Sequence, residues 1–454
     1  MRYSPVSCEQ RDEMLRAVGV GGIDDLFEAV PASVLLEAPL DLPAGLTEME
    51  TAARLRALAD ANTPATRLVS FAGAGCYDHY VPAIVDDVLR KPEFFTAYTP
   101  YQPEVSQGSL QNMYEFQTMI CELTGMDVAN ASMYDGATAF AEAALMAVRV
   151  TKRHRVLVSA AVHPEWQATL RTYADTGVVQ VETVPMSTDT GATDLAEALR
   201  LLETQGADVA AILVTSPSFF GSLEDLGELA EAAHAAGALL VVGTNPILAG
   251  VLEAPGTFGA DIVVGEGQVL GTPMSFGGPG LGFFASRTKH LRMMPGRVVG
   301  RTVDVDGRSA FVLTMQTREQ HIRRERATSN ICSNHALNAL AASVYLSAVG
   351  STGLESIGRA CVTKAHYLRD GLIATGRFSA AFDAPFAHEF TLIFDGDVTQ
   401  MRTALLERGY LAGVPVVDVA GKDLGADPGA VVFAVTEKRT RAEMDAFVEE
   451  VASL

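Results

Sequence analysis

The feature that most limits the fold is the alternation of short apolar runs with helical segments in the first two thirds of the chain. The apolar runs are continuous, which is typical of strands that helices cover on both faces. We expect strands at Val128–Tyr134, Arg155–Ala160, Val178–Val184, Ala210–Thr215, Leu239–Val242, Asp261–Val264 and Leu281–Ala285. We expect helices between several of them at Ala137–Val148, Glu165–Ala174, Thr193–Thr204 and Leu226–Ala236. The pattern predicts a doubly wound, mostly parallel α/β domain.

The first 66 residues differ from this domain in that prolines interrupt them repeatedly. Helical spacing of apolar residues predicts helices near Cys8–Val18 and Leu46–Leu58, with prolines as breakers. We therefore assign residues 1–66 to an N-terminal helical arm. Such an arm either wraps a partner subunit or is a plain surface extension, and the sequence does not distinguish the two.

The rest of the chain divides into a large and a small domain. Residues 67–330 are assigned to the large α/β domain, because all of the alternating strands fall there. Residues 331–454 are rich in helical pattern and include expected strands at Glu389–Phe394 and Ala430–Ala434. This last part predicts a smaller C-terminal α+β domain, and 454 residues are enough for both.

Charge and composition exclude several kinds of partner. The formal net charge of −21 argues against nucleic acid and against an anionic membrane surface. The most apolar run, Ala238–Leu252, is interrupted by Asn245, Pro246 and glycines, so it does not predict a membrane span. The first ten residues do not resemble a signal peptide, and the five cysteines include no C-x-x-C pair. We expect a cytoplasmic protein.

Common catalytic motifs are missing from the sequence. It contains no G-x-G-x-x-G after a strand, no Walker A motif, no H-E-x-x-H and no G-x-S-x-G. None of the nine histidines pair at metal-ligand spacing, so we expect no metal site. The acidic stretch from Asp304 to Gly307 predicts a turn rather than a calcium loop.

A long loop dense in aromatic and polar side chains precedes a helix that Gly125 ends. The loop includes Tyr98, Tyr101 and Gln102, and Ser109 is the expected N-cap of the helix. A loop of this length is usually functional or disordered, and its aromatic content argues against disorder. Either the aromatic side chains serve a site, or they brace the loop by packing.

Four long strings carry a resemblance to a known family. They are YTPYQPEVSQG (Tyr98–Gly108), NASMYDGATAFAEA (Asn130–Ala143), DIVVGEGQVLGTPMSFGGPGLGFFA (Asp261–Ala285) and TREQHIRRERATSNIC (Thr317–Cys332). Together they strongly resemble the P protein of the glycine cleavage system. The length of the chain fits a split form of that protein, in which the N-terminal half is a separate subunit.

The resemblance implies a fold and an activity. It implies the fold-type I, aminotransferase-like fold of pyridoxal-phosphate enzymes. It also implies a complete enzyme that decarboxylates glycine and passes the aminomethyl group to the lipoyl arm of H protein. That chemistry needs a lysine to hold the cofactor as a Schiff base and an acidic group at the pyridine nitrogen.

This chain departs from that requirement at both positions. The resemblance places Gln268 at the lysine position, and an amide cannot form a Schiff base. The acidic residue is expected near the end of the strand Leu239–Val242, but the segment Val242–Asn245 contains none. Lys289 is expected to be an ordinary surface residue. His163 falls where a ring stacks on the pyridine in competent relatives, and here we expect it to be a packing residue. We therefore expect no catalytic residue in this chain and no cofactor bound covalently to it.

The active sites of this fold lie between two subunits, which suggests a role for a chain without the lysine. The resemblance implies an α2β2 assembly in which a lysine-bearing subunit holds the pyridoxal phosphate. Tyr98, Tyr101 and Gln102 are the candidates to wall that subunit's site and to orient glycine or exclude water. Thr328 and Asn330 are the candidates to reach the cofactor phosphate across the interface. They follow a basic segment that consists of Arg318, His321, Arg323, Arg324 and Arg326. The alternative for this segment is a helix cap beside locally paired arginines.

Two other classes of function stay open. One is a self-standing pyridoxal-phosphate enzyme that uses a lysine elsewhere in the chain. The other is a regulatory or scaffolding pseudoenzyme without a part in turnover. The first predicts a cofactor absorption band in the purified chain, and the second predicts that substitutions of Tyr98 or Tyr101 leave turnover unchanged.

Overall fold

The computed structural model describes residues 5–36, 38, 40–420 and 427–454, and it divides into two compact units. The first unit extends to Thr63 and includes α1 (Cys8–Val18) and α2 (Glu48–Asp60). Both helices begin with a capping box, and this confirms the two helices that the sequence predicts here. Among the described residues of this unit, Leu15 is the one buried side chain.

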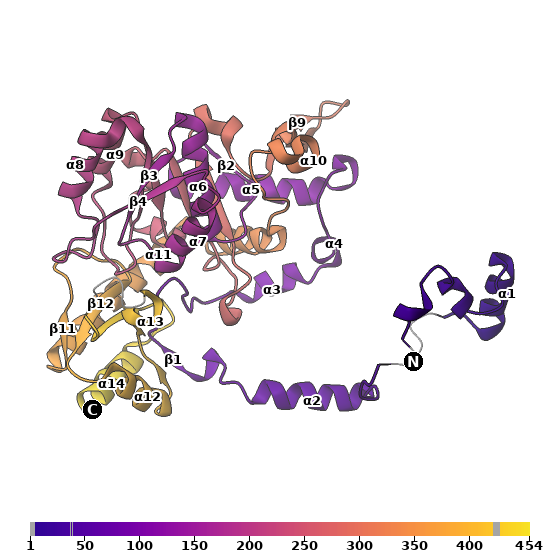
Figure 1. The fold of residues 1–454 in the computed structure, drawn as a ribbon. Helices are drawn as coiled ribbons and strands as arrows, with labels where there is room; N and C mark the ends of the chain where they lie inside the picture. The colour runs from indigo at the N-terminus through magenta and orange to yellow at the C-terminus, as the bar shows by residue number, and fades with distance from the viewer. Residues whose placement is uncertain (1–4, 37, 39, 421–426) are drawn as a thin grey trace. The chain divides into compact units, whose positions relative to one another are not determined.

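The second unit, Pro64–Leu454, is organised around a large twisted sheet (Figure 1). Within the described residues this sheet has seven strands in the order β2–β8–β7–β6–β5–β3–β4. Their bounds are β2 (Val128–Ala129), β8 (Gly282–Ser286), β7 (Ile262–Glu266), β6 (Leu239–Gly243), β5 (Val209–Thr215), β3 (Arg155–Ser159) and β4 (Gln180–Val184). β8 runs antiparallel to both of its neighbours, and the other adjacent pairs are parallel. The predicted mostly parallel sheet is confirmed.

Helices cover both faces of this sheet, as the continuous apolar strands require. One face packs on α6 (Gly136–Thr151) and α7 (Pro164–Ala174) through a core that includes Phe140 and Leu170. The other face packs on four helices whose apolar side chains form a second core. These helices are α5 (Gln107–Thr124), α8 (Leu195–Gln205), α9 (Leu226–Ala235) and α11 (Ala336–Ala374). This double layer confirms the doubly wound domain.

Two local expectations are wrong in detail. The expected strand Val128–Tyr134 is shortened to β2, because Ala131 donates its N–H to the carbonyl of Arg297 instead of to β8, and the next residue, Ser132, takes a positive φ of 141°. The helix expected to begin at Ser109 begins at Gln107, with Ser106 at the N-cap position and without a side-chain capping bond. Gln107 instead forms two hydrogen bonds with β10 (Ser309–Thr314), because its side-chain amide both donates to and accepts from the backbone of Phe311 at 2.9 Å.

The C-terminal part, orange to yellow in Figure 1, is built on a smaller antiparallel sheet. Its strands are β11 (Phe378–Ala380), β12 (Glu389–Phe394), β15 (Ala430–Ala434) and β14 (Val414–Pro415). It also contains α12 (Val398–Glu407), α13 (Val416–Ala420) and α14 (Arg441–Ala452). β1 (Val69–Ser70) pairs with β13 (Tyr410–Leu411), so the segment that leads into the large domain first adds to this part. The expected boundaries at residues 66 and 330 stay a prediction.

Three short helices and a hairpin lie outside the two sheets described above. α3 (Ala83–Leu89) and α4 (Pro92–Phe95) precede the aromatic loop, and α10 (Gln320–Arg323) lies in the basic segment. β9 (Val298–Val303) pairs with β10 as a hairpin. The Asp304–Gly307 turn joins the two strands, with an N–H···O bond from Gly307 to Asp304, so the predicted turn is confirmed.

α11 has the length and composition of a membrane span. Its buried side chains include Tyr345, which packs in the large domain, and Leu368 and Leu372, which pack against the small sheet. Gly350 interrupts its helical dihedral angles. These contacts are those of a core helix that links the two parts of the second unit.

Candidate active site

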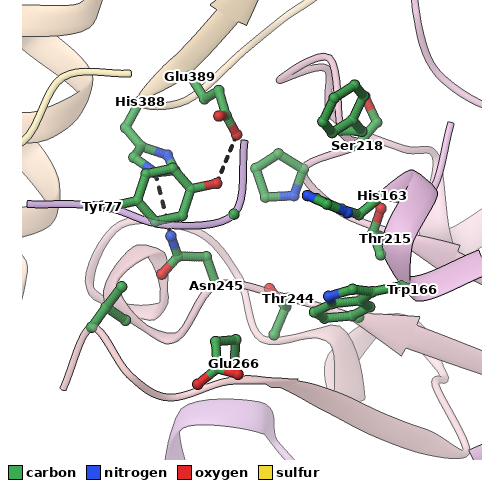
Figure 2. Close-up of a pocket in the computed structure, with 15 residues that line it drawn as sticks. Tyr77, His163, Trp166, Thr215, Ser218, Thr244, Asn245, Glu266, His388 and Glu389 are labelled. Carbon is green, nitrogen blue, oxygen red and sulfur yellow. Dashed lines mark hydrogen bonds between the residues drawn. The ribbon is translucent and has the colours of Figure 1, made fainter. Parts of the chain in front are cut away.

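A cleft opens at the carboxyl ends of the parallel strands, where ligands bind in open α/β sheets (Figure 2). Thr215, Gly243 and Glu266 end β5, β6 and β7 there, and Glu389 at the start of β12 comes from the small domain. The cleft is lined by Gly75, Tyr77, His163, Trp166, Thr215, Pro217, Ser218, Phe219, Gly243, Thr244, Asn245, Glu266, Val269, His388 and Glu389. The fold brings these residues together from six separate segments of the chain.

His163 lies on one wall of the cleft as the N-cap of α7. Its Nδ1 accepts the N–H of Glu165 at 3.2 Å, and its Nε2 lies 3.0 Å from the Ala74 carbonyl oxygen, to which it donates. The ring also meets Phe219 edge to face, with centroids 5.1 Å apart. Burial lowers the pKa of His163, so the ring is neutral and held in one tautomer. It is fixed by packing and capping, as expected from the sequence.

Glu389 contributes a fully buried carboxyl group from the small-domain side of the cleft. Its Oε1 accepts the N–H of Ala74 at 2.6 Å, and its Oε2 accepts the hydroxyl of Tyr77 at 2.8 Å. Burial raises the pKa of Glu389 to about 7, and the two hydrogen bonds offset only part of this effect. The cleft therefore has a carboxyl group that titrates near neutral pH.

His388 lies beside Glu389, and its burial favours the neutral form of the ring. Burial, together with the nearby His79, lowers the pKa of His388 to about 3. Asn245 Nδ2 donates to His388 Nε2 at 3.3 Å, so Nδ1 carries the proton, and Nδ1 has no partner among the described residues. The hydroxyl of Thr215 is likewise buried without a partner in the described part of the chain. The cleft wall thus retains polar groups that a ligand or water can satisfy.

Glu266 projects into the floor of the cleft from the end of β7 (Figure 2). Its Oε2 accepts the N–H of Gly136, the first residue of α6, at 2.9 Å. Its Oε1 accepts the N–H groups of Gln268 at 2.9 Å and Leu281 at 2.7 Å. Burial raises the pKa of Glu266, and the three hydrogen bonds oppose that rise. The carboxylate ties together a helix start, the glycine-rich loop and the start of the strand after it.

The cleft does not fit a covalently bound pyridoxal phosphate. Among the described lining residues there is no lysine, and the glycine-rich loop contributes Glu266 and Val269 to the wall. Gln268 is 7% exposed and donates its side-chain amide to the carbonyl of Thr272, away from the lining. At the end of β6, Asn245 is engaged with His388 and with the N–H of Ile247, and it cannot act as an acidic partner. The described lining residues thus include no lysine to bind the cofactor covalently, and no acidic residue follows β6, where the partner of the pyridine nitrogen is expected.

The other site residues predicted from the sequence lie outside this cleft. Tyr98 and Tyr101 are 78% and 52% exposed, and Gln102 is also exposed. Tyr98 borders a separate hollow. The ring centroid of Tyr101 lies 5.7 Å from that of His321 and 5.8 Å from the guanidinium carbon of Arg297. The structure thus brings the aromatic loop against the basic segment, although their role in a site stays a prediction.

The basic segment divides into buried and exposed arginines. Arg318 is buried and donates to the carbonyls of Met294 and Gly296, so it braces the loop after the last strand of the sheet. The side chains of Arg323, Arg324 and Arg326 are exposed.

Thr328 and Asn330 follow these arginines. Thr328 donates its N–H to the carbonyl of Arg318 at 2.9 Å, and Asn330 is exposed. Between them, Ser329 donates its hydroxyl to the buried Glu142 at 2.6 Å. Within this chain neither Thr328 nor Asn330 reaches the cleft, so a role at a cofactor phosphate needs a second subunit.

Lys289 is exposed and pairs with Asp261 at 3.2 Å. Asp261 also accepts a hydrogen bond from His234 Nε2 at 2.8 Å, and Asp261 precedes β7 at the edge of the sheet opposite to the cleft. Lys289 is therefore an exposed lysine paired with a buried carboxylate, and its exposure agrees with the surface position that the sequence predicts.

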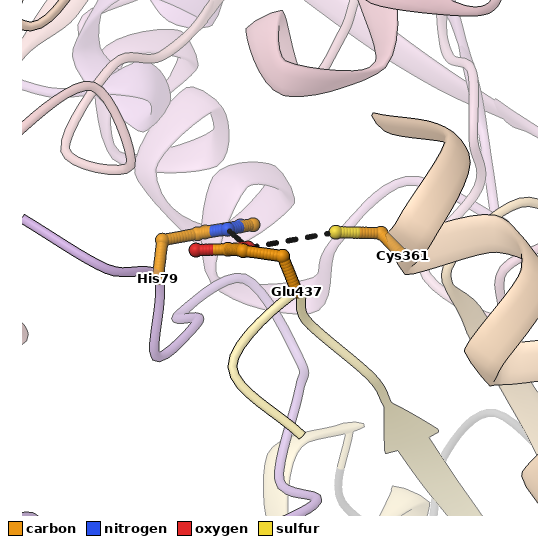
Figure 3. Close-up of side chains that lie close together, drawn as sticks. All are labelled: His79, Cys361 and Glu437. Carbon is orange, nitrogen blue, oxygen red and sulfur yellow. Dashed lines mark hydrogen bonds and ion pairs between the residues drawn. The ribbon is translucent and has the colours of Figure 1, made fainter. Parts of the chain in front are cut away.

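A further cluster joins the two domains beside the cleft (Figure 3). His79, Cys361 and Glu437 place one potential ligand atom each within 4.8 Å of one another. Glu437 Oε2 lies 2.7 Å from His79 Nδ1 and accepts from Cys361 Sγ at 3.6 Å, and its Oε1 accepts the N–H of Tyr80 at 2.6 Å. Burial raises the pKa of the Cys361 thiol, which is therefore a neutral donor. The cluster is a hydrogen-bonded link between residues that are far apart in sequence. For this reason the spacing of histidines along the chain could not reveal it.

The fold and the position of the cleft define the class of this protein. It has the fold-type I architecture of pyridoxal-phosphate enzymes. A solved sphingosine-1-phosphate lyase from Burkholderia pseudomallei superposes with a TM-score of 0.65 at 15% identity, over 93% of this chain and 94% of that one, which supports the fold alone.

Closer similarity defines the family. The family profile described as "Glycine cleavage system P-protein" matches residues 1–451, and the chain belongs to this family. A crystal structure of a glycine decarboxylase (P-protein) of the glycine cleavage system, in inhibitor-bound form, covers both chains completely with 44% identity and a TM-score of 0.91. A "probable glycine dehydrogenase (decarboxylating) subunit 1" of Geobacillus kaustophilus is 50% identical over 99% of this chain and 98% of its own length. The resemblance found in the four sequence strings is confirmed.

Proposed function

We propose that this chain is the subunit without the cofactor lysine in a heteromeric glycine dehydrogenase (decarboxylating), which carries out glycine decarboxylation in glycine cleavage. The observation that supports this most is the cleft itself, which keeps the position of an active site but has no lysine among its described lining residues, with Gln268 at the position expected for the cofactor lysine. The names of full-length relatives, which include "subunit 1", support a partner subunit. When bound in that partner, the cofactor supplies the electron sink for decarboxylation.

The contribution of this chain is to complete the site in the partner. Tyr98, Tyr101 and Gln102 offer an exposed aromatic and polar surface next to the basic segment, and this surface walls the partner's site and excludes water. Thr328 and Asn330 lie in the same region and offer hydroxyl and amide groups to the cofactor phosphate across the interface. The partner holds the pyridoxal phosphate, lipoylated H protein accepts the aminomethyl group, and the assembly is α2β2 in the cytoplasm.

Activity measurements on separated and mixed subunits test this proposal. Glycine, lipoylated H protein and pyridoxal phosphate are supplied to this chain alone, to the lysine-bearing subunit alone and to the two together, and released carbon dioxide is measured. We expect release from the mixture and none from this chain. Release by this chain alone contradicts the proposal and favours a self-standing enzyme. Equal release by the partner with and without this chain favours a scaffold.

A further inference from the structure

We propose that Glu266 is an internal anion that fills a phosphate-type nest in the cleft of this chain and thereby keeps phosphate-bearing ligands out. The inference rests on the proposed function, because it concerns a cleft that works without its own cofactor. The missing lysine explains why no cofactor is bound covalently, but it does not explain why a phosphorylated ligand would stay out of the cleft. A cleft without a lysine can still hold a phosphorylated ligand by its phosphate group.

The nest consists of three backbone N–H groups from three segments. They belong to Gly136 at the start of α6, to Gln268 in the glycine-rich loop and to Leu281 before β8, and all three donate to Glu266 at 2.7 to 2.9 Å. A helix N-terminus combined with convergent loop N–H groups is the donor set that proteins use for phosphate. In this chain a carboxylate side chain takes the place of that anion.

The backbone around the carboxylate is shaped for close approach. A Cβ atom at Gly136 would lie 2.4 Å from the ring of Trp166 and 3.0 Å from the Glu266 nitrogen. A Cβ atom at Gly280 would lie 3.0 Å from Glu266 Oε2. The contact at Gly136 is too short for any other residue, and a Cβ atom at Gly280 would force its neighbours to shift by a few tenths of an ångström. The nest is therefore a close-packed feature of the fold, and Glu266 is fixed inside it.

Electrostatics act in the same direction. Asp135 caps α6 and accepts the N–H of Thr138 at 2.7 Å, so two carboxylates already use the first turn of this helix. Glu389 adds a third carboxyl group on the opposite wall of the cleft. The described lining residues include no arginine or lysine to compensate. A phosphate dianion that entered the cleft would be repelled by these groups.

The test is to remove the internal anion and supply an external one. In the full-length chain, Glu266→Ala frees the three N–H groups, and inorganic phosphate is the probe. We expect phosphate to raise the melting temperature of the variant saturably and to bind at least ten-fold more tightly to it than to the unsubstituted chain, by isothermal titration calorimetry. Chloride at equal ionic strength controls for screening, and Glu253→Ala, at an exposed carboxylate, is the matched substitution that gains no binding.

A second variant separates two effects of Glu266, the filling of the nest by its side chain and the negative charge of its carboxylate. Glu266→Gln keeps the shape of the side chain, so we expect it to bind phosphate no better than the unsubstituted chain. If Glu266→Ala folds poorly, its refolding yield with phosphate against chloride gives the same answer, because an anion in the nest should restore the yield. Equal phosphate binding by the unsubstituted chain and Glu266→Ala overturns the inference, and so does a failure of phosphate to restore that refolding yield. Neither result changes which subunit carries the lysine, so the proposed function is tested independently.

Discussion

The buried carboxyl group of Glu389 predicts a pH-dependent loss of stability that one isosteric substitution removes. Its pKa is raised from 4.5 to about 7 because the cleft desolvates it. A group whose pKa is raised in the folded state stabilises the fold fully below the unfolded pKa, and this stabilisation is lost as the pH rises through the folded pKa. For Glu389 the window lies between about pH 4.5 and pH 7.

The size of the effect follows from the same two values. A difference of 2.5 pKa units between 4.5 and about 7 corresponds to about 3 kcal/mol. Glu389→Gln keeps the shape of the side chain and removes the charge, and an amide can still bond with Tyr77 and with the N–H of Ala74. We therefore expect the variant to gain stability relative to the unsubstituted chain by about 2–3 kcal/mol as the pH rises from 5 to 8.

Urea denaturation at pH 5, 6, 7 and 8 measures this difference directly. Glu224 has a pKa that burial also raises to about 7, so both proteins lose stability with rising pH, and the difference between them isolates Glu389. Glu253→Gln, at an exposed site, is the control and should give a constant difference. A difference between Glu389→Gln and the unsubstituted chain that stays constant from pH 5 to pH 8 refutes the reasoning.

Three further predictions concern the aromatic surface, the buried Asp261 and the partly buried Glu437. Tyr98→Ala and Tyr101→Ala should each lower turnover of the assembled enzyme about ten-fold, or 1.4 kcal/mol, and change the stability of the chain by at most about 0.5 kcal/mol because both side chains are exposed; unchanged turnover favours a scaffold. Although burial opposes it, His290 and His234 hold the pKa of Asp261 well below its usual range, so Asp261→Asn should destabilise the chain in urea at pH 7 and lose its effect below pH 4. Although burial opposes it, the hydrogen bond to His79 lowers the pKa of Glu437 to about 2. Glu437→Gln should therefore lower the free energy of unfolding by about 3 kcal/mol at pH 7, and by less as the pH falls from 4.5 toward 2. An equal loss of stability at pH 7 and pH 3 is evidence against this pairing.

The strands could be predicted from the sequence because each is a continuous apolar run between turn residues. Where local backbone geometry decided the outcome, the prediction was less accurate. β2 ends early where Ala131 bonds to Arg297 and Ser132 takes a positive φ, which no pattern of apolar residues reveals. Ser106 replaces Ser109 at the start of α5, because the contacts of Gln107 with β10 fix where the chain turns.

The cleft shows a clearer division between what sequence can and cannot show. The missing lysine was visible in the text around Gln268, since an absence of chemistry can be read from residue types. The groups that line the cleft could not be found in that way, because Tyr77 and Glu389 are more than 300 residues apart and meet only through the small domain. The role of Glu266 depends on three N–H groups whose convergence is set by backbone geometry alone.

We propose that the cofactor of the assembled enzyme is held by the partner subunit and not by this chain. The most direct measurement is borohydride reduction of the co-purified complex in the presence of pyridoxal phosphate, followed by peptide mass spectrometry of both subunits. We expect a reduced pyridoxyl group on one lysine of the partner and none on any lysine of this chain. A pyridoxyl group on a lysine of this chain would contradict it.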